Sequence, residues 1–157
     1  MSKRNQVLIG SGGILLSLFL GGLIFFIKAV YPMIQAEEDT AKVAHQFANV
    51  DTVDEFFSFT REETVYTIRG RGEGGKEVFV SVPKDGGNIQ VTQVDDGMNR
   101  DAAMKIFKSK NKEVSEIAKV NFGIYKQKPI WEVVGKVKNG FAYGIVDFQS
   151  GKLIGME

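Results

Sequence analysis

The sequence predicts an α+β protein in which an N-terminal transmembrane helix precedes two small repeated units, each one helix packed on an antiparallel sheet of about four strands. Three observations support this prediction. Residues 7–27 form an uncharged run long enough to cross a bilayer. The rest of the chain alternates helix-periodic segments with runs of β-branched and aromatic residues. This alternation occurs twice in the same order, which indicates a repeated plan.

The uncharged run has the sequence VLIGSGGILLSLFLGGLIFFI. At about 1.5 Å per helical residue it spans roughly 31 Å, the thickness of the hydrocarbon core of a bilayer. A cleaved signal peptide has a shorter apolar stretch of about 7–15 residues and a small-residue cleavage site. The nearest such site here is the weak Ile34-Gln35-Ala36, and a lipoprotein would need a Cys, which the chain lacks. We therefore expect an uncleaved anchor over residues 7–30.

Charges beside the run indicate its orientation. Lys3 and Arg4 precede it, whereas Lys28 alone follows it closely. Because Lys and Arg are enriched in cytoplasmic flanks, we expect residues 1–6 to be cytoplasmic and the C-terminal part to be extracytoplasmic, in a single-pass cell-membrane protein.

A stripe of small residues lies within the run. Gly13, Ser17 and Gly21 recur every four residues. Such a stripe lets two membrane helices approach closely, so it is consistent with weak self-association. Glycine is also common in membrane helices without such a role.

Charge divides the exported part into two halves, and we place one unit in each. Residues 31–96 hold 6 Lys and Arg against 13 Asp and Glu, a net charge of −7. Residues 97–157 hold 11 against 6, a net charge of +5. The opposite charges suit mutual attraction, two different partners, or simply two solvated surfaces. The absence of Cys excludes disulfides and thiolate metal sites.

Each half contains the pattern of a helix followed by strands. Pro32 ends or restarts a helix, and apolar residues at helical spacing predict a helix over 33–49. The second half predicts a helix over 99–110 in the same way. Strands are expected at 54–60, 64–69, 76–82 and 89–94, and at 114–125, 130–137, 141–148 and 153–156.

Matching spacings indicate that the halves are repeats. Tyr66 and Val82 are 16 residues apart, and Trp131 and Val146 are 15 apart. Asn139-Gly140 adds a strong hairpin signal to the second half. Units of about 60 residues are marginally stable alone, so we expect the two to pack together.

The second half carries a recognisable pattern of strands and hairpin. Its segments are Pro129-Ile130-Trp131-Glu132-Val133, Tyr143-Gly144-Ile145-Val146-Asp147 and Ser150-Gly151-Lys152-Leu153-Ile154. They resemble the PepSY-type pattern, in which a Trp/Tyr-x-Val strand leads to a Val-Asp-x-x-x-Gly-Lys hairpin. With its membrane helix and two units, the chain resembles the YpmB/TseB-like family of cell-wall elongation regulators of Gram-positive bacteria.

This resemblance implies a PepSY-like, cystatin-like fold and a single-pass membrane location. It also implies association with a class B penicillin-binding protein, without chemistry of its own. The first half departs from the pattern, because Val82-Pro83 stands where the second half has Val146-Asp147. A role for that Asp is therefore not carried over to the first half.

Residues that could support catalysis or metal binding are few. His45 is the only His, so it lacks the partners of a metal site or a catalytic triad. Gly70-x-Gly72-x-x-Gly75 matches a dinucleotide fingerprint, but a strand pattern follows it where the fingerprint needs a helix. The carboxylate pairs lie at helix starts or turns, where they are suited to capping. We expect no enzyme activity, no cofactor and no metal.

Two groups of side chains are candidates for binding. The strand aromatics suit either cross-strand packing or an exposed patch for a protein partner. The basic run at the end of the second helix suits either the helix C-terminus or anionic lipid headgroups and acidic wall polymer. The aromatics are Tyr66, Trp131, Phe141 and Tyr143, and the basic residues are Lys105, Lys108, Lys110 and Lys112.

These observations predict a membrane-tethered, extracytoplasmic protein-binding module that regulates cell-wall elongation. Its expected partners are the membrane and a penicillin-binding protein, and nucleic acid is not expected outside the cytoplasm. The alternative is an inhibitor or chaperone of an exported protease, because PepSY-type units occur in peptidase propeptides.

Overall fold

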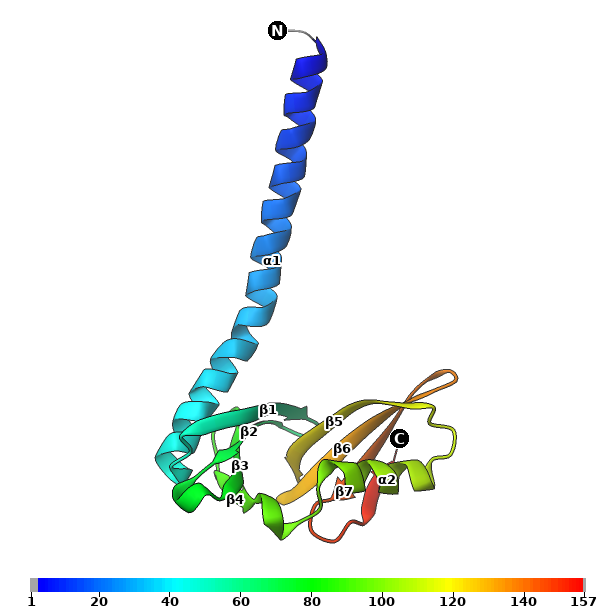
Figure 1. Cartoon of the computed structure of the whole chain (residues 1–157). Helices are drawn as coiled ribbons and strands as arrows, with labels where there is room; N and C mark the ends of the chain where they lie inside the picture. The colour runs from blue at the N-terminus through cyan, green and yellow to red at the C-terminus, as the bar shows by residue number, and fades with distance from the viewer. Residues whose placement is uncertain (1–2, 157) are drawn as a thin grey trace. The chain divides into compact units, whose positions relative to one another are not determined.

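One long helix begins the described chain. The computed structural model describes the backbone of residues 3–156 and the side chains of residues 15–156 (Figure 1). Helix α1 extends from Lys3 to Ala48 with Pro32 inside it. The expected break at Pro32 and the separate helix over 33–49 are therefore wrong. A Pro removes one backbone hydrogen bond, and a long helix can bend at that point without ending.

The remaining chain forms two four-stranded antiparallel sheets, and one helix follows the first sheet and precedes the second in chain order (Figure 1). The first sheet, in the order β1-β2-β3-β4, consists of Thr52–Thr60, Thr64–Arg71, Glu77–Pro83 and Gln90–Gln93. Helix α2 (Arg100–Lys110) follows. The second sheet, in the order β5-β6-β7-β8, consists of Glu116–Tyr125, Lys128–Val137, Gly140–Asp147 and Leu153–Met156. Short 3-10 helices occur at Glu73–Gly75 and Val94–Asp96.

The predicted α+β class, the apolar N-terminal helix and the two four-stranded sheets are confirmed. A repeated unit of one helix on one sheet is not confirmed, because no separate helix precedes the first sheet. The chain instead divides into two compact units, residues 1–36 and residues 37–157. The second unit contains both sheets, α2 and the last turns of α1.

The last turns of α1 and the residues after them cover one face of the first sheet. Ala44 and Val50 pack against Ile68 and Val80, and all four are buried. Since side chains alternate along a strand, Phe57 and Phe79 lie on the opposite face of this sheet.

The two sheets meet where β1 lies beside β5. The rings of Phe79 and Phe122 stack with centroids 3.8 Å apart and planes 9° apart. Trp131 meets both rings edge-on, at 5.7 Å from Phe79 and 5.2 Å from Phe122. The buried amide of Asn121 donates a hydrogen bond of 2.8 Å to the Ser58 carbonyl. One continuous core therefore joins the sheets.

Helix α2 closes this core over the second sheet. The Asn99 side chain caps its first turn by accepting a hydrogen bond of 2.9 Å from the Ala102 N–H. Its side chains Ala103 and Phe107 face the core and are fully buried. The Phe107 ring lies directly against Gly144 of β7, where a Cβ would clash with it. The closeness of helix and sheet therefore depends on this glycine.

Gly144→Ala should lower the free energy of unfolding by about 1–3 kcal/mol, because the added methyl must displace Phe107 from a packed core. Urea denaturation followed by the fluorescence of Trp131, the single Trp, measures the change. Gly155→Ala in the neighbouring strand is the matched control. Its Cβ would meet Ile145 at an ordinary 3.5 Å, so unfolding should be nearly unchanged. Equal effects of the two variants would contradict this account of α2 packing.

Candidate functional site

The four predicted aromatic residues do not form one patch. Trp131 is only 3% exposed, whereas Phe141 is 53% exposed and Tyr143 is 38% exposed. Tyr66 is half-buried in the other sheet, stacked on Phe56 with ring centroids 5.7 Å apart. Trp131 pairs with Val146, so its side chain lies on the same sheet face as that of Val146. The side chains of Phe141 and Tyr143 lie on the opposite face, because side chains alternate along a strand.

Trp131 has a structural role in this arrangement. Its indole Nε1 donates a hydrogen bond of 2.9 Å to the Met98 carbonyl, and the Met98 N–H donates one of 2.9 Å to the Phe148 carbonyl. The two bonds hold the segment that leads into α2. A buried Trp N–H needs such an acceptor. The structure therefore places this residue in the core.

Phe141 and Tyr143 remain as an exposed aromatic pair. They lie two residues apart on β7, so both side chains project from the same sheet face. We call them the β7 aromatic pair. Exposed aromatic side chains of this kind are enriched at the energetic centres of protein interfaces.

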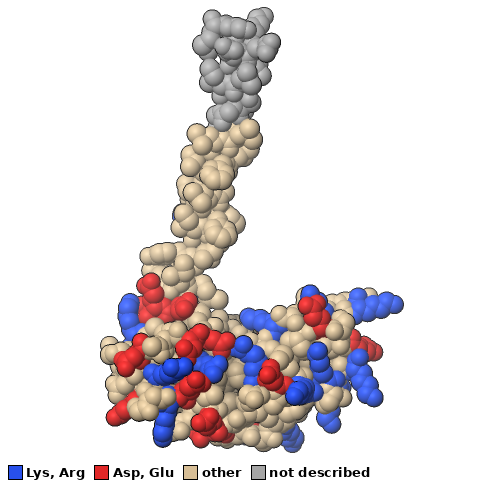
Figure 2. Space-filling view, in the orientation of Figure 1, with Lys and Arg blue, Asp and Glu red and all other residues tan. Residues whose placement is uncertain are grey.

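The predicted basic residues lie along α2 and just beyond it, and all four are exposed. Lys105 and Lys108 line a cleft of about 230 Å³ together with Asp101 and the apolar side chains of Met104 and Ile117. Figure 2 shows that blue side chains outnumber red ones over the part of the surface where Figure 1 places α2 and β5 to β7. The structure thus brings two of the four lysines to one site with an apolar floor.

A network of ion pairs lies at the junction of the sheets, and the sequence patterns gave no indication of it. Arg69 pairs with Glu55 at 3.3 Å and with Glu77 at 2.7 Å, and Arg100 pairs with Glu55 at 2.8 Å. The Arg100 guanidinium also lies 5.8 Å from the centre of the Trp131 ring. Both arginines line a cleft of about 270 Å³. Because both are already ion-paired, the cleft does not offer an uncompensated positive charge.

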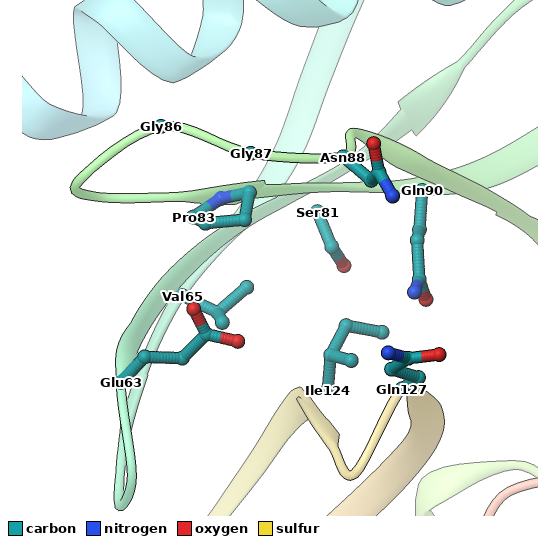
Figure 3. A pocket seen from close by; sticks show the side chains of 10 residues that line it. All are labelled: Glu63, Val65, Ser81, Pro83, Gly86, Gly87, Asn88, Gln90, Ile124 and Gln127. Atoms are coloured by element: carbon teal, nitrogen blue, oxygen red, sulfur yellow. The ribbon is translucent and has the colours of Figure 1, made fainter.

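A third cavity, a pocket of about 190 Å³, lies between the β3–β4 loop and the β5–β6 turn (Figure 3). Asn88 and Gln90 line it on one side and Gln127 on the other, with Val65 and Ile124 also lining it. The predicted strand ends implied a turn near residue 127. They gave no sign that it lies across from the β3–β4 loop, because that depends on how the sheets pack.

No metal site is present among the described side chains, and the sequence motifs considered for chemistry lie in ordinary structural positions. Residues 15–156 contain no group of three or more His, Cys, Asp or Glu residues placed to hold a metal ion. His45 is exposed and its Nε2 lies 3.7 Å from an Asp51 carboxylate oxygen. The Gly70–Gly75 segment ends in a short 3-10 helix between two strands, so it does not open a helix that could hold a phosphate.

Comparison with known proteins finds similarity to one group of proteins. Residues 40–83 match the family model described as the cell wall elongation regulator TseB-like domain. This part of the chain is therefore similar to a TseB-like domain. The match covers the last turns of α1 and strands β1 to β3, whereas the resemblance predicted from sequence rested on β6 to β8. The two similarities therefore lie in different parts of the chain.

Two relatives extend this similarity beyond the matched segment. The chain is 27% identical over 145 residues to the probable cell wall elongation regulator TseB of Bacillus subtilis (strain 168), which covers 91% of this chain and 89% of the relative. It is also similar to the solved structure of the YpmB protein from Bacillus subtilis, with a TM-score of 0.68 and 28% identity. That likeness covers 76% of this chain and 94% of the solved chain.

Asp147, the acidic residue of the hairpin pattern, organises the β7–β8 turn. Its Oδ1 accepts hydrogen bonds from the Ser150 hydroxyl at 2.6 Å and from the Ser150 N–H at 2.7 Å. These hydrogen bonds favour the ionised form and lower the pKa of Asp147. The first sheet has Pro83 at the corresponding place, and Pro cannot accept hydrogen bonds through its side chain. The residue therefore stabilises a turn in the second sheet.

Asp147→Asn should lower the free energy of unfolding at neutral pH by about 1 kcal/mol, the value of a charged hydrogen bond that solvent partly screens. Because the folded-state pKa is lowered, the carboxylate adds stability above its unfolded pKa of about 3.9, and this stability is lost as pH falls through the folded pKa. Urea denaturation across the acid range should show the variant and the wild type converging. Asp85→Asn, at an exposed turn, is the control and should change little. A difference that persists in strong acid would contradict the proposed role.

Proposed function

We propose that this protein is a membrane-anchored, extracytoplasmic binding module that regulates cell-wall elongation by associating with a class B penicillin-binding protein. The observation that carries the proposal is the similarity to a probable cell wall elongation regulator over 91% of the chain. The match of residues 40–83 to the TseB-like domain model also supports it. In this proposal the protein binds and positions its partner and is not itself an enzyme.

The apolar helix supports membrane anchoring. Leu15–Ala48 contains a segment with a mean hydropathy of 1.9, long and apolar enough to cross a membrane. Its large apolar side chains are exposed in the described structure, and Figure 2 shows almost no charge along the described apolar part of α1. A bilayer would remove these side chains from water. The basic Lys3 and Arg4 favour a cytoplasmic N-terminus and an extracytoplasmic C-terminal unit.

Tethering would itself aid regulation. Confining the module to the surface that holds its partner raises the effective concentration of each for the other. Weak self-association through the small-residue stripe remains part of the proposal. Nothing lies within 4 Å of a Cβ built at Gly21, and Gly13 is outside the residues whose side chains are described.

The β7 aromatic pair is the proposed contact with the penicillin-binding protein. A photo-crosslinking residue in place of the exposed Lys138, in the adjacent turn, should capture a class B penicillin-binding protein in native membranes. The double variant Phe141→Ser and Tyr143→Ser should reduce that capture about tenfold or more, because two exposed aromatic anchors are lost. Mass spectrometry of the crosslinked product identifies the partner.

Val91→Ser is the matched control, since Val91 is an exposed apolar residue, at 48%, in the other sheet. It should leave capture unchanged. Repeated failure to capture any wall-synthesis protein would contradict the proposed function. Capture of an exported protease would instead favour the inhibitor alternative.

The four lysines along and just beyond α2 are proposed to contact anionic lipid headgroups or acidic wall polymer; they are Lys105, Lys108, Lys110 and Lys112. Amides of residues 100–110 should exchange hydrogen more slowly when the full chain is in nanodiscs that contain phosphatidylglycerol than in neutral nanodiscs. A teichoic acid added to the neutral nanodiscs tests the polymer. Replacing all four lysines by Gln should remove the protection, whereas Lys126→Gln with Lys128→Gln should keep it. Equal exchange under all three conditions would refute this contact.

A further inference from the structure

The pocket of Figure 3 is built from polar groups that the fold does not use. Among the described residues, the carboxamides of Asn88, Gln90 and Gln127 make no hydrogen bond within the protein, whereas the buried Ser81 hydroxyl is paired with Thr67 at 2.8 Å. Figure 3 shows the Gln90 and Gln127 side chains extending toward one another from opposite walls. Each carboxamide can donate and accept at once. The pocket therefore presents three groups ready for a ligand.

The turn that carries Gln127 is held in an unfavourable backbone conformation. Lys126 has a φ of 49° and Gln127 a φ of 63°, in the left-handed region that favours glycine or asparagine. Tyr125 pairs with Lys128, so Lys126 and Gln127 are the two central residues of a two-residue hairpin turn. Such turns strongly prefer Asn-Gly. A long carboxamide at the second position is thus a poor choice for the turn and a good one for the pocket, and strain of this kind is typical of ligand sites.

The floor and charge of the pocket restrict the ligand. Val65 and Ile124 are buried aliphatic side chains, and none of the described side chains that line the pocket is aromatic. Glu63 is the sole charged lining residue, which disfavours an anion. The volume of about 190 Å³ lies below the range of about 300–1,000 Å³ that is usual for larger ligands. A sugar ring typically stacks on an aromatic side chain, so the aliphatic floor favours a small alkyl group.

We propose that this pocket binds one small aliphatic residue of an extended, uncharged peptide segment. The aliphatic side chain lies on Val65 and Ile124, and the flanking peptide groups exchange hydrogen bonds with the carboxamides. A peptide N–H and C=O are the complement of a carboxamide C=O and N–H. This inference rests on the proposed function, since it identifies the kind of segment through which a protein partner is held.

The test is a titration of the ¹⁵N-labelled full chain in detergent micelles with acetyl-Ala-Ala-Ala-N-methylamide. Side-chain amide signals of Asn88, Gln90 and Gln127 should shift and saturate, while those of Gln93 and Gln149 stay fixed. Gln127→Gly should weaken binding about fivefold, the effect of one lost neutral hydrogen bond. The same variant should raise the urea midpoint, because glycine adopts the left-handed conformation without strain. If Gln127 were needed only for the fold, its replacement would not weaken peptide binding while raising the urea midpoint.

Lys126→Gly is the matched control, because it relieves the same turn without touching the pocket. It should raise the midpoint and bind the peptide as the wild type does. The inference is overturned if the peptide causes no saturable shift, if Gln127→Gly binds as tightly as the wild type, or if N-acetylglucosamine binds in place of the peptide. Crosslinking to a penicillin-binding protein without peptide binding would refute this inference alone. Peptide binding without such crosslinking would refute the proposed partner alone.

Discussion

The stacked rings of Phe79 and Phe122 are the contact on which the rest of the structure depends. Each ring comes from a different sheet, and Trp131 and Phe148 meet the pair edge-on. A unit of about 60 residues, a four-stranded sheet with one helix, is only marginally stable alone. The aromatic cluster removes the inner faces of both sheets from water together. Residues 37–157 are one compact unit for this reason.

Charge contributes less to this junction than the sequence pattern suggests. The acidic and basic halves do meet through ion pairs, Arg100 with Glu55 and Arg61 with Glu132. In the second pair the positive residue comes from the acidic half and the negative residue from the basic half, so this pair does not follow from the net charges of the halves. Partly exposed pairs stabilise by about 1 kcal/mol or less. Burial of several large aromatic side chains stabilises the junction more than these ion pairs do. The net charge of each half therefore acts mainly at the outer surface.

The packing of the two sheets also decides which side chains are exposed. It buries Trp131 and leaves the β7 aromatic pair exposed. It also brings the strained turn at Lys126 and Gln127 opposite the β3–β4 loop, which creates the polar pocket. A binding module needs rigid elements that hold its contact groups in place. Here the sheets supply that rigidity, and in the proposed function α1 confines the module to the membrane surface.

Local pattern in the sequence determined the apolar helix, the α+β class and all eight strands to within a few residues, because the period of apolar side chains is a property of each segment alone. The TseB-like resemblance also followed from short strand and hairpin segments. Tertiary structure decided the passage of α1 through Pro32, the burial of Trp131, the ion pairs of Arg69 and Arg100, and the pocket around Gln127. Each of these depends on which residues distant in sequence come into contact. Strand periodicity shows that a side chain points to one face of its sheet, but only packing shows what covers that face.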